Sequence, residues 1–296
     1  MTRTRSRRSR LASTRSSTVS IRARCAASAP SRGGERAGAW CSRARAREPP
    51  VGDRPALDAV LLDAGGTLVR LDFEWMAETL AALGAPADPA ELRRAELEGR
   101  RRYDRSRGLG AAHDEPHAAP NGDIHAYFGG LLDGAGLTPP LRDLALERFF
   151  ERDARVGLWR RPAEGARAAL DRLRELGLRC AVVSNSDGRA EMLLADCGML
   201  PGLEFVVDSH RVGVEKPDAG IFRIALDRMG VPPGRALYVG DIRSVDEVGA
   251  RRAGVHFMLL DPYGDYAPPD TPRIARMDEL ATWIESHFEL PARSQP

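Results

Sequence analysis

Helical and strand patterns alternate along the second half of the chain, and this alternation is the strongest constraint on the fold. Short apolar runs that predict strands lie at 179–184, 204–208, 236–240 and 256–260. Amphipathic segments that predict helices lie at 163–176, 187–197, 218–229, 245–253 and 277–288. Short connections between alternating helices and strands are typical of a parallel sheet that is covered by helices. We therefore expect an α/β fold with a doubly wound parallel sheet.

The first strand of this sheet is predicted far upstream, at 58–63, where a buried-type apolar run ends in Asp63. Between about residue 73 and residue 157 no strand pattern is found, and the periodicity is helical. Helices are expected there at 75–83, 90–105, 124–135 and 141–155. The sequence thus predicts a core of residues 56–71 and 160–290, interrupted after its first strand by an all-helical insert of residues 72–159.

The first 50 residues differ in composition from the rest of the chain. They contain 13 Arg, no Lys and two acidic residues, and they lack apolar periodicity. We expect residues 1–55 to form a disordered basic tail, because such a segment buries too little apolar surface to offset the entropy of ordering. A transit peptide, a nucleic-acid-binding arm and translated upstream sequence before a misassigned start are the three interpretations, and the heavy use of Arg, Ala and Gly favours the last.

Charge and hydropathy narrow the class of partner for the rest of the chain. Residues 51–296 carry 31 Lys and Arg against 40 Asp and Glu, a net charge of −9, which does not favour nucleic-acid binding. The sequence contains no run of 18 apolar residues, so it predicts no membrane span. Four cysteines among 296 residues do not make a disulfide framework. We expect a cytoplasmic protein that binds a small molecule; the sequence does not indicate the oligomeric state.

Polar residues follow four segments of the predicted sheet, at or just past the carboxyl ends of its strands. Ligands of open α/β sheets bind at that edge, so residues that follow different strands meet there. Each of these residues alone would be a helix cap, a turn or a surface charge, but together and in this order they predict one site. In chain order they are Asp63, Gly65, Ser184, Asn185, Lys216, Asp241 and Asp246.

The order Asp…Ser…Lys…Gly-Asp-x₄-Asp resembles the motifs of the haloacid dehalogenase-like (HAD) hydrolase superfamily, over roughly residues 57–290. The stretches at 182–188 and 239–242 resemble its phosphatase-type branch, and the helical insert is similar to that family's cap domain of the first type. The resemblance implies a Rossmann-like core and a Mg²⁺-dependent phosphohydrolase. Its substrate would be a small phosphorylated metabolite, and the reaction would pass through an aspartyl-phosphate.

The resemblance makes Asp63 the nucleophile that attacks phosphorus. A cation is expected beside this carboxylate because carboxylate and phosphate repel, and Mg²⁺ prefers oxygen ligands. The resemblance implies that Asp63, the backbone carbonyl of Gly65 and Asp241 bind the ion. Asp246 is assigned to the same metal site; it lies five residues after Asp241, from where it would orient a ligand or a bound water.

Three further residues are expected to bind the phosphate. Ser184 and Asn185, with amides at the start of the following helix, would hold phosphate oxygens. Lys216 is the single lysine among 44 basic residues, and it would neutralise both the nucleophile and the transferring phosphoryl group. Arg is a poor replacement for so compact a cation.

Gly65 departs from the family pattern, because phosphatases of this superfamily usually carry a second Asp two residues after the nucleophile. That Asp protonates the leaving group and activates water, so its loss should matter most for alcohol leaving groups and least for acyl or aryl phosphates. His113, His117 and His125 are candidate substitutes, although exposed loop histidines are the simpler interpretation.

Two alternatives stay open. One is a phosphate-binding or regulatory relative with weakened catalysis, which the glycine at position 65 would mark. The other is a 2-haloacid dehalogenase, which is disfavoured because Asp241 and Asp246 without a cation would repel Asp63. Phosphonate hydrolysis in this family needs a lysine in the cap, and residues 72–159 contain none.

Overall fold

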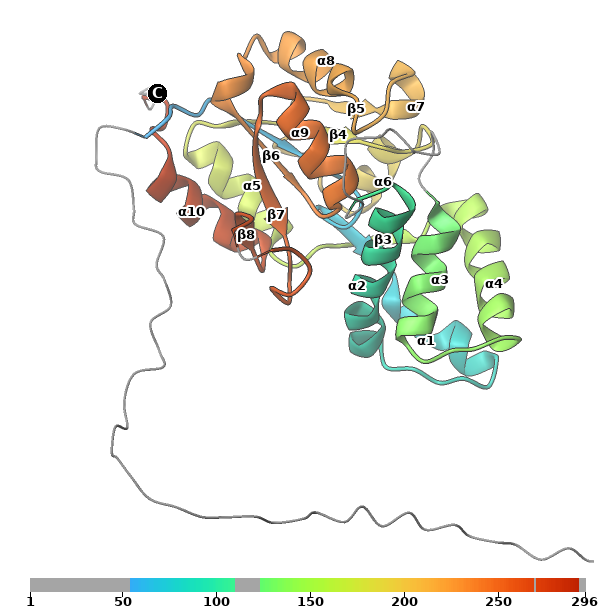
Figure 1. Ribbon diagram of the computed structural model, residues 1–296. Helices are drawn as coiled ribbons and strands as arrows, with labels where there is room; N and C mark the ends of the chain where they lie inside the picture. The colour runs from blue at the N-terminus through green and yellow to red at the C-terminus, as the bar shows by residue number, and fades with distance from the viewer. Residues whose placement is uncertain (1–53, 110–122, 269, 293–296) are drawn as a thin grey trace, which may run out of the picture. The chain divides into compact units, whose positions relative to one another are not determined.

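The computed structural model describes residues 54–109, 123–268 and 270–292, and within them six strands form one parallel sheet (Figure 1). The order across the sheet is β5-β4-β1-β6-β7-β8, and each pairing is parallel. The strands are β1 (Ala59–Leu62), β4 (Arg179–Ser184), β5 (Val206–Asp208), β6 (Ala236–Gly240), β7 (His256–Leu260) and β8 (Arg273–Ile274). The α/β prediction is confirmed.

The central strand β1 separates two halves that the chain builds in turn. From β1 the chain builds β4 and β5 on one side and then crosses to β6, β7 and β8 on the other. Leu62 is paired with Val182 of β4 and with Val239 of β6, so β1 ends at the point where the strand order reverses. Such a switch point is where open α/β sheets bind ligands.

Helices cover both faces of the sheet, so every residue of β1 is buried. Val60 and Leu62 pack into the apolar cluster that includes residues of α5 and α10, whereas Ala59 and Leu61 pack into the cluster with residues of α8 and α9. This two-sided burial explains why the strand is a continuous apolar run. These helices are α5 (Ala166–Glu175), α8 (Ala219–Met229), α9 (Val248–Ala253) and α10 (Leu280–His287), and the shorter ones are α6 (Ala190–Asp196) and α7 (Ser209–Val212).

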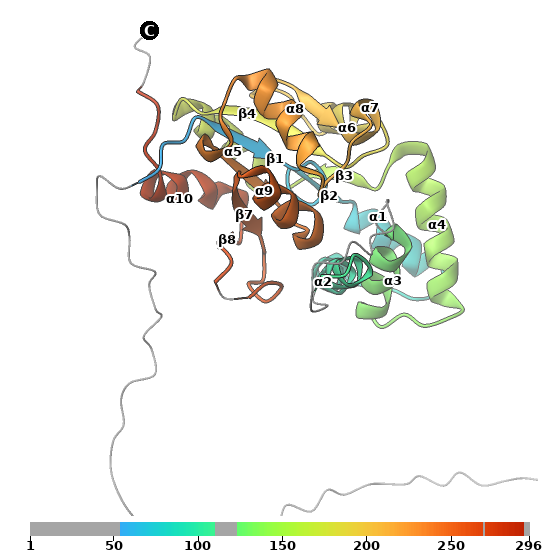
Figure 2. The same ribbon diagram turned by 45° about the horizontal axis from the view of Figure 1, so that its top comes forward.

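Four helices between the first two sheet strands share a third apolar cluster, and we call them the cap. They are α1 (Phe73–Ala82), α2 (Pro89–Ser106), α3 (Ile124–Gly134) and α4 (Leu141–Val156), drawn together in Figure 2. Helices α2 and α3 approach each other closely through two glycines. A Cβ at Gly99 would lie 2.6 Å from the carbonyl oxygen of Tyr127, and one at Gly130 would lie 2.8 Å from that of Glu98.

A two-stranded antiparallel ribbon joins the cap to the sheet, and the sequence does not predict it. Its strands are β2 (Val69–Leu71) and β3 (Trp159–Pro162). Strands of three and four residues are too short to show a period, which explains the omission. Asp72 ties the ribbon to the cap, because its carboxylate binds Arg152 of α4 at 2.8 Å and Arg161 of β3 at 2.9 Å.

Other differences from the predicted elements are local. Helix α6 begins at Ala190 rather than at 187, since the carboxylate of Asp208 accepts hydrogen bonds from the amides of Gly188 and Ala190, both at 3.1 Å. A π-helical turn, Arg243–Glu247, precedes α9, and the two-residue strand β8 and helix α7 are not predicted. The predicted tail, up to residue 53, lies outside the described residues. Of the described helices, none has the length and apolar character that crossing a membrane requires.

Candidate active site

The loop after β1 presents Asp63 at the switch point and folds back tightly on itself. The carbonyl of Ala64 accepts hydrogen bonds from the amides of Leu68 and Val69, both at 2.9 Å. Gly66 has a φ of +81°, and a Cβ there would lie 2.1 Å from Oδ2 of Asp241. Only glycine allows the loop to pass this close to Asp241. The loop therefore brings two carboxylates from different strands together.

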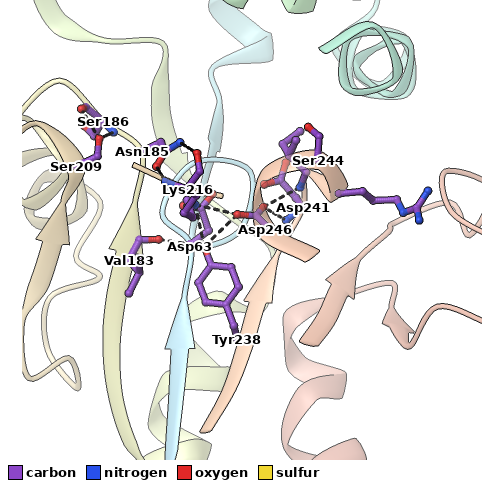
Figure 3. A network of polar contacts seen from close by, with 12 residues as sticks. Asp63, Val183, Asn185, Ser186, Ser209, Lys216, Tyr238, Asp241, Ser244 and Asp246 are labelled. Carbon is purple, nitrogen blue, oxygen red and sulfur yellow. Dashed lines mark hydrogen bonds and ion pairs between the residues drawn. The ribbon is translucent and has the colours of Figure 1, made fainter. Parts of the chain in front are cut away.

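Lys216 lies at the centre of a buried polar network, which Figure 3 shows. Its Nζ is 2.8 Å from Oδ1 of Asp63, 2.8 Å from Oδ1 of Asp246 and 2.8 Å from the hydroxyl of Tyr238. The residue is 1% exposed. Burial by itself would lower the pKa of Lys216, but the charges of Asp246 and Asp63 outweigh it and raise that pKa. Lys216 is therefore a fixed cation at the nucleophile.

Asp246 is fully buried, and both of its carboxylate oxygens are hydrogen-bonded. Oδ1 is bound by Lys216 and by the hydroxyl of Tyr238, the latter at 3.1 Å. Oδ2 accepts from the amides of Asp241 and Ile242, at 3.0 and 2.8 Å. A Cβ at Gly240 would lie 2.5 Å from the Asp246 carboxyl carbon. This arrangement lets Asp246 orient Lys216 and the backbone that carries Asp241.

Asp241 is the reverse case, since one of its oxygens lacks a hydrogen bond. Its Oδ1 is buried with no protein partner among the described residues, whereas Oδ2 lies 3.3 Å from Nη2 of Arg100. A buried carboxylate oxygen without a partner is costly, so this atom points to a cation that the protein would bind there. Carboxylate oxygens of Asp63, Asp241 and Asp246 lie within 4.8 Å of one another, and hard oxygen donors suit Mg²⁺.

Two acids of this cluster have raised pKa values, which a nearby cation would lower. Burial raises the pKa of Asp63 from 3.8 to about 6; the charge of Lys216 lowers it, and that of Asp246 raises it further. Burial also raises the pKa of Asp241 well above its usual range, Arg100 lowers it, and Asp246 and Asp63 raise it. The donor set therefore fits a divalent ion.

Helix α2 of the cap brings a positive charge to this cluster, and the sequence does not single it out. Arg100 of α2 is 3% exposed, with Nη2 3.3 Å from Asp241 and 3.4 Å from Glu96 and Nη1 3.3 Å from the carbonyl of Leu260. Arginines of a helix usually face solvent, and the sequence gives no reason to expect this one to be buried. The spacing of Glu96 and Arg100 at i,i+4 is a signal in the sequence, but it does not show which core residue the pair meets.

Ser184 and Asn185 end β4 at the same edge, with different surroundings. Ser184 lines the cavity above Asp63. The side chain of Asn185 is bound at both ends by the main chain of Lys216: its Oδ1 accepts from the amide at 2.7 Å, and its Nδ2 donates to the carbonyl at 3.0 Å. The helix-start amides expected to hold phosphate are partly occupied, since Gly188 and Ala190 donate to Asp208.

A cavity of about 270 Å³ lies above these residues. Its floor is polar and includes Asp63, Ser184, Lys216 and Asp241, with Gly65 at the edge. Its wall is largely aromatic and aliphatic. The residues of that wall are Val69, Tyr103, Ile124, Tyr127, Trp159 and Leu193. The cavity can thus hold a small molecule with its polar end on Asp63.

The candidate proton donors have different positions. His125 lies in the first turn of α3, where it is exposed and packs on Phe150 with ring centroids 4.2 Å apart. His113 and His117 lie outside the described residues. Asp153 of α4, which the sequence does not single out, lines the cavity, and burial raises its pKa although the charge of Arg189 lowers it.

Comparison with known proteins agrees with this geometry. Residues 57–254 match the description of the haloacid dehalogenase-like hydrolase family. The chain is 47% identical over 98 residues to haloacid dehalogenase-like hydrolase domain-containing protein 3 of Xenopus laevis, covering 33% of this chain and 40% of that protein. It is 37% identical over 150 residues to phosphoserine phosphatase of Thermus thermophilus, covering 48% of this chain and 58% of that protein.

One solved structure of similar fold is that of the HAD-hydrolase YfnB from Bacillus subtilis bound to magnesium. It superposes with a TM-score of 0.51 at 20% identity and covers 77% of this chain and 99% of that one. The chain spans about half the length of the curated relatives that it matches.

Proposed function

The chain belongs to the haloacid dehalogenase-like hydrolase family, and we propose that it is a Mg²⁺-dependent phosphohydrolase acting on a small phosphate monoester. One observation carries this proposal: Asp63 lies against Lys216 at 2.8 Å, beside the unpartnered Oδ1 of Asp241. A nucleophilic carboxylate beside a fixed cation, and near a carboxylate oxygen that has no partner among the described residues, suits phosphoryl transfer better than it suits other displacement reactions.

In the proposed reaction Asp63 attacks phosphorus and the bond from phosphorus to the leaving oxygen breaks. The leaving oxygen takes the electron pair, and an aspartyl-phosphate forms on Asp63. Water then attacks this phosphorus and loses a proton to solvent, the bond to the Asp63 oxygen breaks with its electron pair returning to that carboxylate, and inorganic phosphate is released. Lys216 remains protonated throughout and stabilises the charge that spreads over the phosphoryl oxygens.

Mg²⁺, when bound, would neutralise the repulsion between the carboxylate and the phosphate. Asp63 and Asp241 would hold it with side-chain oxygens, and Gly65 with its carbonyl. Asp246 would act by orienting Lys216 and Asp241, because both of its oxygens are already hydrogen-bonded.

The phosphate group itself would meet two further residues at the end of β4. Ser184 would bind a phosphate oxygen with its hydroxyl. Asn185 would contribute its backbone amide, because its side chain is held by the main chain of Lys216. The side chain of Asn185 then serves to place Lys216, and the expected substrate is a small phosphorylated molecule.

Two alternatives make different predictions. A 2-haloacid dehalogenase would use Asp63 without a metal, but three buried carboxylates and the unpartnered oxygen of Asp241 favour a cation. A regulatory relative would bind phosphate without turning over esters, and Gly65 is the feature that favours it.

The test is the release of phosphate from 4-nitrophenyl phosphate and from phosphoserine with Mg²⁺, with a chelator, and with the Asp63→Asn variant. We expect Mg²⁺-dependent release that the chelator and Asp63→Asn abolish. Asp227→Asn, an exposed acid on α8, is the matched control and should match wild type. Halide release from 2-chloropropionate without metal would contradict the proposal, and phosphate binding without release would support the regulatory relative.

A further inference from the structure

Three aromatic rings that neighbour one another in space form part of the wall of the cavity above Asp63. Tyr103 of α2 and Tyr127 of α3 are 6.4 Å apart between centroids with an edge-to-face angle of 87°. Tyr127 and Trp159 of β3 are 6.3 Å apart with their planes at 40°. All three line the cavity, so a substrate with its phosphate on Asp63 would place its other end against these rings.

The hydroxyl of Tyr127 is already engaged by a carboxylate of the protein, so we take its ring as the surface that a substrate would contact. Its oxygen lies 2.5 Å from Oε1 of Glu96, a buried acid that also pairs with Arg100. Val69, Ile124 and Leu193 fill the space around the rings. Aromatic rings pack favourably against other flat rings as well as against apolar groups. The wall is thus suited to a flat apolar group.

Trp159 covers the space where an acid at position 65 would lie. A Cβ added at Gly65 would be 3.2 Å from both Cδ1 and Nε1 of the indole, closer than side chains usually approach. A side chain at position 65 would therefore require the indole to shift by a few tenths of an ångström. The glycine at position 65 and the packing of Trp159 in the aromatic wall are therefore linked in this chain.

The positive charges of the cavity are already paired. Of the described residues that line it, Lys216 and Arg189 carry a positive charge. Lys216 binds Asp63 and Asp246, and Nε of Arg189 binds both oxygens of Asp187, at 3.0 and 2.8 Å. Neither cation among the described lining residues is thus left unpaired for a second negative group on the substrate. Arg107, whose guanidinium lies 5.9 Å from the Tyr103 ring, is not among the lining residues.

The chemistry of the leaving group agrees with this wall. Without an acid at position 65, the leaving oxygen departs as an anion, and general acid catalysis of about 10²–10⁴-fold is lost. A phenol, with a pKa of about 10 as in tyrosine, tolerates this loss far better than an alcohol does. A flat ring on the leaving oxygen would both pack against the wall and make that oxygen a better leaving group.

From these observations we propose that the substrate is an aryl phosphate, that is, the phosphate monoester of a small uncharged phenol. The proposal rests on the phosphohydrolase function proposed above. A cavity of about 270 Å³ is large enough for one ring and a phosphate. Trp159 and Tyr103 are then specificity-determining residues, and Gly65 leaves room for the indole.

Four substrates separate the two features of the proposed substrate, its ring and its weakly basic leaving oxygen. Phenyl phosphate has both, benzyl phosphate has the ring with an alcohol leaving group, acetyl phosphate has the stable leaving anion without a ring, and phosphoserine has neither. With Mg²⁺ we expect kcat/KM for phenyl phosphate to exceed that for benzyl phosphate by about 100-fold or more. The KM for phenyl phosphate should be about three- to tenfold below that for acetyl phosphate.

The wall is tested by variants of Trp159. Trp159→Leu should raise the KM for phenyl phosphate about fivefold and leave that for acetyl phosphate within twofold, whereas Trp159→Phe keeps a ring and should remain near wild type. The wild-type enzyme gives the same test without a variant. Phenylphosphonate should inhibit acetyl phosphate hydrolysis at about tenfold lower concentration than methylphosphonate.

Several results would overturn the proposal and leave the phosphohydrolase function intact. These are benzyl phosphate turned over as fast as phenyl phosphate, equal inhibition by the two phosphonates, or a KM for phosphoserine below that for phenyl phosphate. Loss of benzyl phosphate turnover in Asp153→Asn would then identify the acid that this proposal excludes. If the wild-type enzyme hydrolyses neither phenyl phosphate nor acetyl phosphate faster than the Asp63→Asn variant does, the phosphohydrolase function itself is wrong.

Discussion

The floor and the wall of the cavity are built from different parts of the chain and by different chemistry. The floor comes from the sheet, where Lys216 binds three oxygens at 2.8 Å and Asp246 has both of its oxygens hydrogen-bonded. The wall comes from the cap and the ribbon, where Tyr103, Tyr127 and Trp159 offer ring surfaces. The floor is polar and densely hydrogen-bonded, and the part of the wall that these rings form is apolar, although Asp153, Asp187 and Arg189 also line the cavity.

This difference assigns separate tasks to the two regions. The charges of the floor are fixed before the substrate arrives, which is what stabilisation of a developing phosphoryl charge requires. The wall makes contacts that depend on the shape and polarity of the leaving group. We therefore expect changes in the floor to lower kcat for every substrate, and changes in the wall to alter KM for some of them.

The largest effect is expected for Lys216→Arg in the floor. The variant keeps the positive charge, but a planar guanidinium cannot fit where one nitrogen meets three oxygens at 2.8 Å. We expect kcat to fall about 10²–10³-fold for phenyl and acetyl phosphate alike. Steady-state kinetics on both substrates measures this, and a wild-type kcat would break the assignment of Lys216 to the floor.

Arg100 of the cap contacts Asp241 of the floor, and Arg100→Met tests this contact. The change leaves Glu96 and Asp241 buried without their cation, so we expect the free energy of unfolding to fall by about 3 kcal/mol. Arg101→Met is the matched control, because Arg101 is partly exposed and contacts Asp265 at the surface. Urea unfolding measures both. Equal losses in the two variants would show that the buried pair with Asp241 is not special.

Mg²⁺ should restore part of the stability that Arg100→Met loses. The ion would supply positive charge beside Asp241 in place of the guanidinium. A melting temperature that rises more with Mg²⁺ in Arg100→Met than in Arg101→Met is the expected result. No difference between the two would place the ion away from Asp241.

The floor should also show a dependence on pH that the wall does not. Because the pKa of Asp63 is about 6 in the folded metal-free protein against 3.8 ordinarily, its proton must leave before a metal binds. Mg²⁺ affinity should fall about tenfold for each pH unit below 6. Without metal, the free energy of unfolding should fall as pH rises from about 4 to about 6, since the unfolded chain loses that proton first. Calorimetric titration at pH 5 to 8 tests the affinity, and a flat profile would contradict the shift.

The smallest effect is expected where floor and wall meet, at Gly65. Gly65→Asp alone would crowd the indole, since a Cβ there lies 3.2 Å from Trp159. We expect it to raise turnover of benzyl phosphate only a few-fold, and more when combined with Trp159→Phe, which makes room for the carboxyl group. If the double variant is no faster than Gly65→Asp alone, the indole does not occupy the space of the missing acid.

The sequence predicts the floor better than the wall, for a physical reason. Asp63, Ser184 and Asp241 each follow a strand of a parallel sheet, and the carboxyl ends of such strands share one edge, so local patterns locate them. The parallel sheet follows from the alternation of helix and strand, whereas the order of its strands is seen only in the structure. The partners of these residues, such as Tyr238 with Lys216, could be expected only once the register of β6 was known.

The positions of the wall residues and of Arg100 depend on tertiary packing, which no local sequence pattern predicts. Helix α2 contains many arginines, and periodicity does not distinguish buried Arg100 from exposed Arg94, since the difference lies in the core residues that face each one. Trp159 lies in a strand of four residues that the sequence does not show. Its position over Gly65 follows from the pairing of β3 with β2.

The central claim is that Asp63 carries the phosphoryl group during the reaction, and it can be measured directly. Since the position that would activate water is a glycine, release of the phosphoryl group from Asp63 should be slow and the intermediate should accumulate. Phenyl phosphate and Mg²⁺ mixed with the enzyme, quenched in acid and analysed by peptide mass spectrometry, should give a phosphorylated peptide that contains Asp63. Asp63→Asn should give none. Release of phosphate by the wild-type enzyme with that peptide unmodified throughout the time course would contradict the claim.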